Sequence, residues 1–412
     1  MLYRFMEYQR AMFAPFAAWA ANAASALSDH GNFLSRLPGA PAFAAGYEML
    51  YRLGQGNDKP GFSIAAVEHN GCVIPVVEQV VVKRAFCRLL RFATATAAPG
   101  AAEPPRPAVL VCAPLAGHHA VIVREVVESL LPEHIVYVTD WIDACCVPLA
   151  EGPFHLDDYV TELQAFIRRI GAAQALHVIA ICQATVPALA AVSLLASADE
   201  PTPRSLILIG GPIDARHSPT AVGRLAADHP LVWFQRNLIY TVPDRYAGAG
   251  RKVYPNFLQL AGLMAAQPGL LPASHWHYYS ELALGNYKRA EALRRVCEAY
   301  LAVLDMAAEF YLDTIEIVFQ QFRLARGNWF VRGELVRPQD IRATTLLTIE
   351  GDHDAISGCG QTRAAHELCR GIAARDKRHV TAPRCGHYDL FSGPRWHFEI
   401  YPGIQAVMRQ GS

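Results

Sequence analysis

The stretch from His177 to Leu189 constrains the fold more than any other part of the chain. A short β-branched run stops at Cys182, and an Ala-rich helical pattern follows over 184–198. A strand that enters a helix through a one-residue bend is crowded around the bend, so small residues are favoured two positions before and after it. Ala180 and Ala184 occupy those two positions. The spacing predicts that Cys182 projects from a sharp strand-to-helix turn.

Two simpler interpretations compete with this one. Residues 171–198 are apolar enough to suggest a membrane span, but polar residues and a proline interrupt them. A spanning helix needs about 20 largely uninterrupted apolar residues, so we expect no transmembrane segment. Alternatively, Cys182 is an ordinary buried thiol, unless a histidine and a carboxylate lie at suitable places further along the chain.

Strands and helices alternate on both sides of this turn, which predicts an α/β fold with a mostly parallel sheet and helices on both faces. A strand–Cys–helix turn in such a sheet is typical of the nucleophile elbow of the α/β-hydrolase fold. Two further strand-like segments and a proline-rich loop precede the alternation. The expected strands cover 72–82, 86–94, 108–112, 135–138, 178–181, 205–209, 344–349 and 379–382, and the loop covers 97–107.

The alternation stops near residue 213 and resumes near 343, and the segments between are helical and rich in aromatic residues. We expect an all-helical cap over the carboxyl edge of the sheet, where ligands bind in this architecture. Its helices are expected at 254–264, 274–283 and 290–322, and a core helix at 361–374. The expected organisation is an N-terminal helical extension over 1–70, with two helices ending at 54–57, a core over 71–212 and 343–412, and the cap over 213–342.

Composition excludes several classes of protein. The 37 basic and 37 acidic residues balance, so we expect no nucleic-acid partner. The ten Cys show no Cys-x-x-Cys pair, which favours reduced thiols over a disulfide framework. We therefore expect no metal and no cofactor. The adjacent Cys145 and Cys146 are expected to serve as packing residues. Residues 11–27 resemble a secretory signal, but the aromatic spacing within them favours a retained amphipathic helix.

Two later turns supply the partners that Cys182 needs. The strand at 344–349 leads to Asp352 and Asp354, and the last strand leads to His387. This order of nucleophile, carboxylate and histidine is the one that α/β-hydrolases use. His387 would accept the thiol proton and pass it to the leaving group, while a carboxylate orients the ring. We prefer Asp354, because the glycine three positions before it matches the turn after this strand in hydrolases, and keep Asp352 as the alternative.

Acyl transfer also needs N–H donors for the oxyanion that forms at the carbonyl. One donor is expected to be the backbone amide of Gln183, directly after the nucleophile. The second is expected in the loop after the first core strand, from Leu115 or Ala116. His118 and His119 follow in the same loop, and we expect them beside this site as substrate-binding residues.

With these residues in place, the chain resembles the intracellular poly(3-hydroxybutyrate) depolymerases. The resemblance implies a Cys-Asp-His triad, which maps onto Cys182, Asp354 and His387, and action in the cytoplasm on amorphous storage granules. The matching stretches span nearly the whole length: Met1-Leu-Tyr, Tyr8-Gln-Arg-Ala, Ala14-Pro-Phe, Ala45-Gly-Tyr-Glu-Met-Leu, Cys182-Gln-Ala-Thr-Val-Pro, Phe310-Tyr-Leu-Asp-Thr-Ile-Glu and Gly386-His-Tyr.

Two alternatives stay open beside this resemblance. Polyhydroxyalkanoate synthases use a similar Cys triad in the opposite direction, but they usually keep glycine where this chain has Ala180 and Ala184. A catalytically inactive granule-bound protein is the other alternative. The acyl acceptor, water or coenzyme A, also stays open, as does the oligomeric state, with a homo-oligomer allowed.

A polyester granule is an apolar surface, and an aromatic-rich neutral protein could dock on it without charge steering. Trp276 and Tyr278 in the expected cap are the further candidates for substrate binding. Internal packing is the simpler interpretation of all the aromatic candidates for this contact, which are Phe13, Phe16, Trp19, Trp276, Tyr278 and Tyr279.

Overall fold

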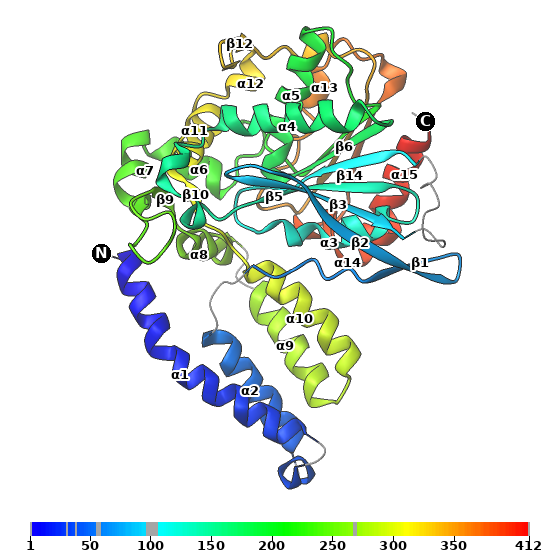
Figure 1. Cartoon of the computed structure of the whole chain (residues 1–412). Helices are drawn as coiled ribbons and strands as arrows, with labels where there is room; N and C mark the ends of the chain where they lie inside the picture. The colour runs from blue at the N-terminus through cyan, green and yellow to red at the C-terminus, as the bar shows by residue number, and fades with distance from the viewer. Residues whose placement is uncertain are drawn as a thin grey trace.

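The computed structural model describes residues 2–29, 32–37, 39–54, 59–95, 106–266 and 270–410. A nine-stranded sheet runs through the molecule (Figure 1). Its first strands pair antiparallel up to the contact between β3 and β5, and the strands from β5 to β14 are parallel. The order across the sheet is β1 (Ala66–His69), β2 (Cys72–Lys83), β3 (Cys87–Thr94), β5 (Ile135–Trp141), β4 (Ala108–Cys112), β6 (Leu176–Ile181), β7 (Ser205–Ile209), β13 (Thr345–Gly351) and β14 (Lys377–Ala382).

Alternating side chains of the parallel strands build two core layers. On β4, Leu110 belongs to one layer, and its neighbours Val109 and Val111 belong to the other. All three are fully buried, as expected for a sheet covered on both faces. The α/β fold with a mostly parallel sheet is therefore confirmed. The covering helices are α4 (Leu156–Gly171) and α5 (Thr185–Ser197) on the first face, and α3 (Arg124–Leu130) and α15 (Tyr401–Gln410) on the second (Figure 1).

An insertion separates β7 from β13. The expectation that it is all helical is wrong, because β10 pairs antiparallel with β9, and β9 with β8. These strands are only two or three residues long, and β10 lies far from β8 and β9 along the chain, so no local periodicity predicts them. The insertion contains α6 (Ala221–Asp228), α7 (Leu231–Leu238), β8 (Tyr240–Thr241), β9 (Lys252–Tyr254), α8 (Asn256–Ala266), α9 (Leu270–Ala283), α10 (Tyr287–Leu301), β10 (Met306–Ala307), α11 (Ala308–Asp313), the π-helical turn η6 (Thr314–Gln320), α12 (Arg323–Arg326), β11 (Phe330–Val331) and β12 (Glu334–Leu335).

The N-terminal helices pack with part of this insertion. We call the unit formed by α1 (Leu2–Ser28), η1 (Phe33–Arg36), α2 (Ala40–Gly54), α9 and α10 the helical lobe, and it lies to one side of the sheet (Figure 1). Small side chains line the contact between α1 and α2: Ala17, Ala20 and Ala24 on α1, and Ala44 and Ala45 on α2, are all buried. Alanine at these positions lets the two helix backbones approach closely.

Several boundaries differ from the expected ones. The sheet begins with β1, inside the range 1–70 that we expected to be helical extension. The helix expected over 290–322 is broken after Leu301, and the helix expected over 361–374 is reduced to α13 (Ala365–Leu368). Most of the expected loop at 97–107, and residues 55–57 at the expected end of the second helix, lie outside the described residues. Nowhere in the described ranges does a helix have the length and apolar character to cross a membrane.

Candidate active site

Cys182 lies at the bend between β6 and α5. Its φ angle is +56°, in the left-handed region, which costs a residue with a side chain roughly 1–2 kcal/mol. Such strain is tolerated where the surrounding structure fixes the backbone. Ala180 and Ala184 are fully buried on either side of the bend, and the Thr185 hydroxyl donates to the Cys182 carbonyl at 2.9 Å. The predicted strand-to-helix turn is therefore present.

Asp354 and His387 meet at the carboxyl edge of the same sheet. His387 Nδ1 lies 2.7 Å from Asp354 Oδ2, and both residues are buried. The other carboxylate oxygen, Oδ1, accepts the backbone N–H groups of Ile356 and Ser357, each at 2.8 Å. The carboxylate is therefore held in one orientation toward the imidazole.

The structure also brings the Cys182 thiol to this imidazole. Burial by itself lowers the pKa of His387, but the charges of Asp354 and then Cys182, with hydrogen bonds to both side chains, hold this pKa well above its ordinary value. Since Nδ1 faces Asp354, the second ring nitrogen is the one left for sulfur. Three side chains that are far apart in the sequence thus form one relay.

The His387 ring is fixed by close packing. Gly210, at the end of β7, has φ +56°, and a Cβ built on it would lie 3.3 Å from His387 Cε1 and 3.0 Å from Leu390 Cδ1. Tyr388 and Phe391 contact the ring edge to face, with centroids 5.4 and 5.7 Å away. Any side chain larger than hydrogen at Gly210 would therefore press on the imidazole.

Asp352, the alternative carboxylate, is exposed, and its Oδ1 accepts the backbone N–H of Cys385 at 3.2 Å. It therefore supports the turn that carries His387 rather than contacting the ring. The tertiary structure selects Asp354 as the partner of the imidazole.

Two glutamine side chains hold the loop that faces Cys182. Gln183 Oε1 accepts the Ala116 N–H at 2.8 Å, and Gln259 Oε1 accepts the Gly117 N–H at 3.0 Å. The Ala116 N–H, one of the two predicted oxyanion donors of this loop, therefore already has an acceptor in this structure. Within the described ranges, the Leu115 N–H donates to no carbonyl or side chain. Of the two predicted donors in this loop, the Leu115 N–H is the one without an acceptor among the described residues.

The two histidines of this loop have different surroundings. His118 Nε2 lies 2.9 Å from the Tyr388 hydroxyl, beside the catalytic turn, and burial, followed by the charges of His387 and His119, lowers its pKa to about 3. His119 instead interacts with Lys59, Asp140 and Arg88; burial, followed by the Lys59 charge, lowers its pKa to about 4. The structure thus brings His118 next to the relay, whereas His119 faces the ion pairs that Lys59 and Arg88 form with the buried Asp140.

Trp276 and Tyr278 do not join the site. Both lie on α9, which packs on α2 and α10 in the helical lobe. Tyr278 is buried and lines a cavity of about 400 Å³ between α1, α2, α9 and α10. Trp276 is 65% exposed and stacks on Tyr279, with centroids 5.6 Å apart. The α9–α10 pair packs against the N-terminal helices, so these two residues lie apart from the relay, and their contact with the polyester stays a prediction.

Sequence reasoning missed two residues that the structure brings to the site. Gln259 comes from α8, and besides the Gly117 N–H it binds the Leu304 carbonyl through its amide at 2.8 Å. Tyr300, near the end of α10, packs on Tyr388 with centroids 4.7 Å apart. Tyr388 follows His387 directly and could have drawn attention, but nothing in the local sequence distinguishes Gln259 or Tyr300 from ordinary helix residues.

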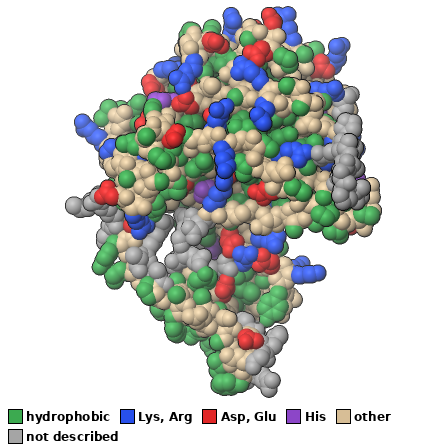
Figure 2. Space-filling model, in the orientation of Figure 1, with side chains coloured by type: hydrophobic (Ala, Val, Ile, Leu, Met, Phe, Trp, Pro, Cys, Tyr) green, Lys and Arg blue, Asp and Glu red, His purple; other side chains and the backbone are tan. Residues whose placement is uncertain are grey.

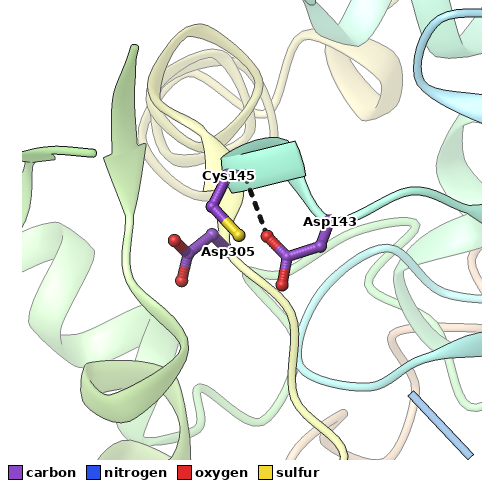
Figure 3. Close-up of side chains that lie close together, drawn as sticks. All are labelled: Asp143, Cys145 and Asp305. Carbon is purple, nitrogen blue, oxygen red and sulfur yellow. Dashed lines mark hydrogen bonds between the residues drawn. The ribbon is translucent and has the colours of Figure 1, made fainter. Parts of the chain in front are cut away.

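A second cluster of polar side chains lies apart from this relay. The ligand atoms of Asp143, Cys145 and Asp305 are all within 4.8 Å of one another (Figure 3). Asp305 accepts the Tyr3 hydroxyl at 2.6 Å and the Asn256 N–H at 2.8 Å, so both its carboxylate oxygens already have donors. The cluster therefore links α1 and α8 to the body as a hydrogen-bonded anchor.

The sheet topology and the strand–Cys182–helix turn, with Asp354 and His387 after the last two strands, define an α/β-hydrolase. Residues 210–412 match the family model described as the C-terminus of PHB de-polymerases, so the chain carries this domain. The domain on this fold supports an ester-cleaving hydrolase.

Solved structures with a similar chain trace include hydrolases and lipases. A 2-hydroxy-6-oxo-6-phenylhexa-2,4-dienoate hydrolase from Rhodococcus is 14% identical, with TM-score 0.47, covering 82% of this chain and 99% of that chain. A putative lipase from Acinetobacter baumannii is 12% identical, with TM-score 0.47, covering 81% and 93%. A monoacylglycerol lipase from Paleococcus ferrophilus is 15% identical, with TM-score 0.45, covering 75% and 96%. No curated protein matches the sequence of this chain.

Proposed function

We propose that this protein is a poly(3-hydroxybutyrate) depolymerase that cleaves ester bonds of amorphous storage polyester, on granules in the cytoplasm, through an acyl-Cys182 intermediate. The observation that carries the proposal is the relay of Cys182 with the buried His387 and Asp354, in a chain whose residues 210–412 match the depolymerase domain.

The geometry supports a two-step acyl transfer. His387 takes the proton of the Cys182 thiol, and the sulfur attacks the carbonyl carbon of the ester. When the tetrahedral adduct collapses, the ester C–O bond breaks, and His387 gives its proton to the departing alcohol oxygen.

The second step releases the acyl group. A water molecule gives a proton to His387, and its oxygen attacks the thioester carbonyl. When this second adduct collapses, the C–S bond breaks and His387 gives the proton to the departing Cys182 sulfur. A coenzyme A thiol could take the place of water, giving an acyl-CoA instead of a free acid. Asp354 stays hydrogen-bonded to Nδ1 in both steps and stabilises the imidazolium.

We propose that two backbone N–H groups bind the oxyanion in both steps. They are those of Gln183, directly after the nucleophile, and Leu115, whose neighbours are held by glutamine side chains. Removing one oxyanion donor typically lowers turnover by a factor of roughly a hundred or more. His118 and its partner Tyr388 lie beside the relay, and we propose that they line the acyl-binding side of the site.

The test is release of 3-hydroxybutyrate units from protein-free particles of amorphous poly(3-hydroxybutyrate). Wild-type protein should release them, and Cys182→Ala protein should not. Substantial release by the Cys182→Ala protein would reject the assignment of the nucleophile. Parallel incubations with and without coenzyme A distinguish the two acceptors by their products, and an incubation with 3-hydroxybutyryl-CoA alone tests for chain growth, the synthase reaction.

Covalent labelling separates an active enzyme from an inactive granule protein. An ester-mimic inhibitor should label Cys182, and the Cys182→Ala variant should lose the label. The labelling is best done on a Cys146→Ser background, because a hydrogen bond from Cys145 lowers the pKa of the exposed Cys146 thiol to about 7, which makes it a competing nucleophile. Absence of labelling at Cys182 together with retained granule binding would favour the inactive protein.

A further inference from the structure

The helical lobe exposes a row of large apolar side chains on α1. Tyr8, Met12, Phe16 and Trp19 are 65%, 63%, 50% and 52% exposed. Their spacing of four, four and three residues places them on one face of the helix. A different face of the helix carries the buried alanines Ala17, Ala20 and Ala24. We call these four residues the apolar stripe. Figure 2 shows hydrophobic side chains over the lobe at the lower end of the molecule.

More exposed apolar side chains of the lobe add to this row. Phe13, Phe33 and Phe43 are 61%, 71% and 63% exposed. The stripe is partly preorganised, because Trp19 stacks on Phe16 with centroids 5.6 Å apart and contacts Tyr47 edge to face at 5.3 Å. Rings held in this way lose little conformational entropy when a partner covers them.

The charge pattern indicates what kind of surface covers the stripe. Residues 11–28 contain no Asp, Glu, Lys, Arg or His. Helices that lie on anionic membranes carry Lys and Arg on the polar face, since attraction to the lipid headgroups contributes to their binding. A charge-free segment with exposed aromatic rings instead matches a surface that is apolar, neutral and insoluble in water.

The lobe is also joined to the active site. Helix α10 ends at Leu301, where Tyr300 packs on Tyr388, the neighbour of His387. The Ala302 carbonyl then accepts the His119 N–H at 2.8 Å. The lobe that carries the stripe is therefore connected through α10 to the turn that holds His387.

We infer that the apolar stripe of α1 docks the enzyme on the surface of its water-insoluble polyester, so that the lobe serves as a granule-binding module. This inference rests on the proposed function, because that function supplies the neutral polymer surface. Docking keeps the enzyme beside many ester bonds, and the relay then acts on chains that reach the site.

The experiment uses full-length protein with the substitution Cys182→Ala, so that binding is measured without turnover. The probe is protein-free particles of amorphous poly(3-hydroxybutyrate), and the bound fraction is measured by co-sedimentation. The test variant adds Met12→Ser, Phe16→Ser and Trp19→Ser. The matched control adds Phe330→Ser and Phe398→Ser, two body residues that are 56% and 80% exposed. Circular dichroism and thermal unfolding check that each variant is folded.

The stripe variant should bind the particles roughly a hundredfold or more weakly, since each buried aromatic side chain accounts for about tenfold or more in affinity. The control should bind within about twofold of the parent protein. In proteins that keep Cys182, the ratio of polymer hydrolysis to hydrolysis of soluble p-nitrophenyl butyrate should fall for the stripe variant alone. Equal particle binding by the stripe variant and the parent would overturn the inference.

The same experiments test two other partners that could cover the stripe, a lipid surface and a second copy of the chain. Binding to phosphatidylcholine vesicles as tight as to the polyester would mean that the stripe docks on lipid, and would overturn the inference. So would a dimer, seen by sedimentation equilibrium, that the stripe substitutions dissociate. Failure of the proposed function looks different: the protein would bind the particles through the stripe, yet the form that keeps Cys182 would release no 3-hydroxybutyrate.

Discussion

The side chain of Gln183 accepts the Ala116 N–H at 2.8 Å, so the residue after the nucleophile fixes the loop that faces it. Under the proposed mechanism its own backbone N–H would bind the oxyanion, so that one residue would serve the site through its backbone and through its side chain.

Replacing Gln183 by Leu should lower kcat for p-nitrophenyl butyrate by about tenfold to a hundredfold, with a smaller change in KM. The substitution leaves the Ala116 N–H without its acceptor, and a small shift of the loop misplaces the neighbouring Leu115 donor. The control is Gln320→Leu, which removes a glutamine that donates to two carbonyls elsewhere in the insertion. An unchanged kcat for Gln183→Leu would mean that the loop holds its position without this contact.

The two aspartates after β13 should behave differently when each becomes asparagine. Asp354→Asn should lower kcat by roughly a thousandfold to ten-thousandfold, because an amide cannot hold the imidazole in the required tautomer or stabilise its positive charge. Asp352→Asn should change kcat by only a few fold, because that side chain contacts the Cys385 N–H rather than His387. Steady-state kinetics on a soluble ester measures both, and a larger loss for Asp352→Asn would reverse the assignment.

Gly210→Ala should lower both stability and kcat. Gly210 and Gly285 both have positive φ, +56° and +74°, so alanine at either costs about 1 kcal/mol in backbone strain. Gly285 has nothing within 4 Å of an added Cβ, whereas Gly210 faces His387 and Leu390. Gly285→Ala therefore controls for the backbone cost, and the extra loss of kcat in Gly210→Ala measures the displacement of the imidazole. Similar kcat values for the two variants would argue against that contact.

Stability should fall as the pH drops from about 6.5 to about 4. Burial, followed by the positive charges of His134 and Arg204, lowers the pKa of His177 from 6.5 to about 4. The unfolded chain therefore takes up this proton first, and the stabilisation, complete above pH 6.5, is lost progressively as the pH falls toward 4. One such histidine contributes up to about 1.4 kcal/mol per pH unit in this window.

Urea unfolding at pH 7, 6, 5 and 4.5 measures this slope. The variant His177→Asn retains a group that can bond the Ser205 hydroxyl, which lies 2.8 Å from His177 Nδ1 in the wild type. Its free energy of unfolding should decline less steeply over the same window. An identical slope for the variant would show that His177 does not contribute to the acid sensitivity.

Local sequence pattern was sufficient where the structure depends on near neighbours. The bend at Cys182 follows from a β-branched run, two small flanking residues and an adjacent helix, all within a few positions of one another. The alternation of strands and helices predicted the parallel sheet in the same way. The fold and the nearness of Cys182, Asp354 and His387 could therefore be predicted, because strands of one parallel sheet bring their carboxyl ends to a common edge.

Contacts between distant segments could not be predicted in this way. The position of α9 and α10, with Trp276 and Tyr278, beside the N-terminal helices could not be predicted, because an aromatic-rich helix packs equally well on a sheet edge or on another helix. The three-stranded sheet of the insertion was missed for a related reason, since its strands are too short to show a period.

The sequence by itself determined the α/β architecture, the bend that presents Cys182 and the order in which its partners follow, because periodicity and backbone crowding act over a few residues. Only the tertiary structure decided between Asp352 and Asp354, placed Gln183 on Ala116 rather than leaving that N–H open, and turned the α1 stripe outward. Those outcomes depend on which groups from remote segments satisfy one another's hydrogen bonds and bury one another's surface, and no local pattern encodes such a choice.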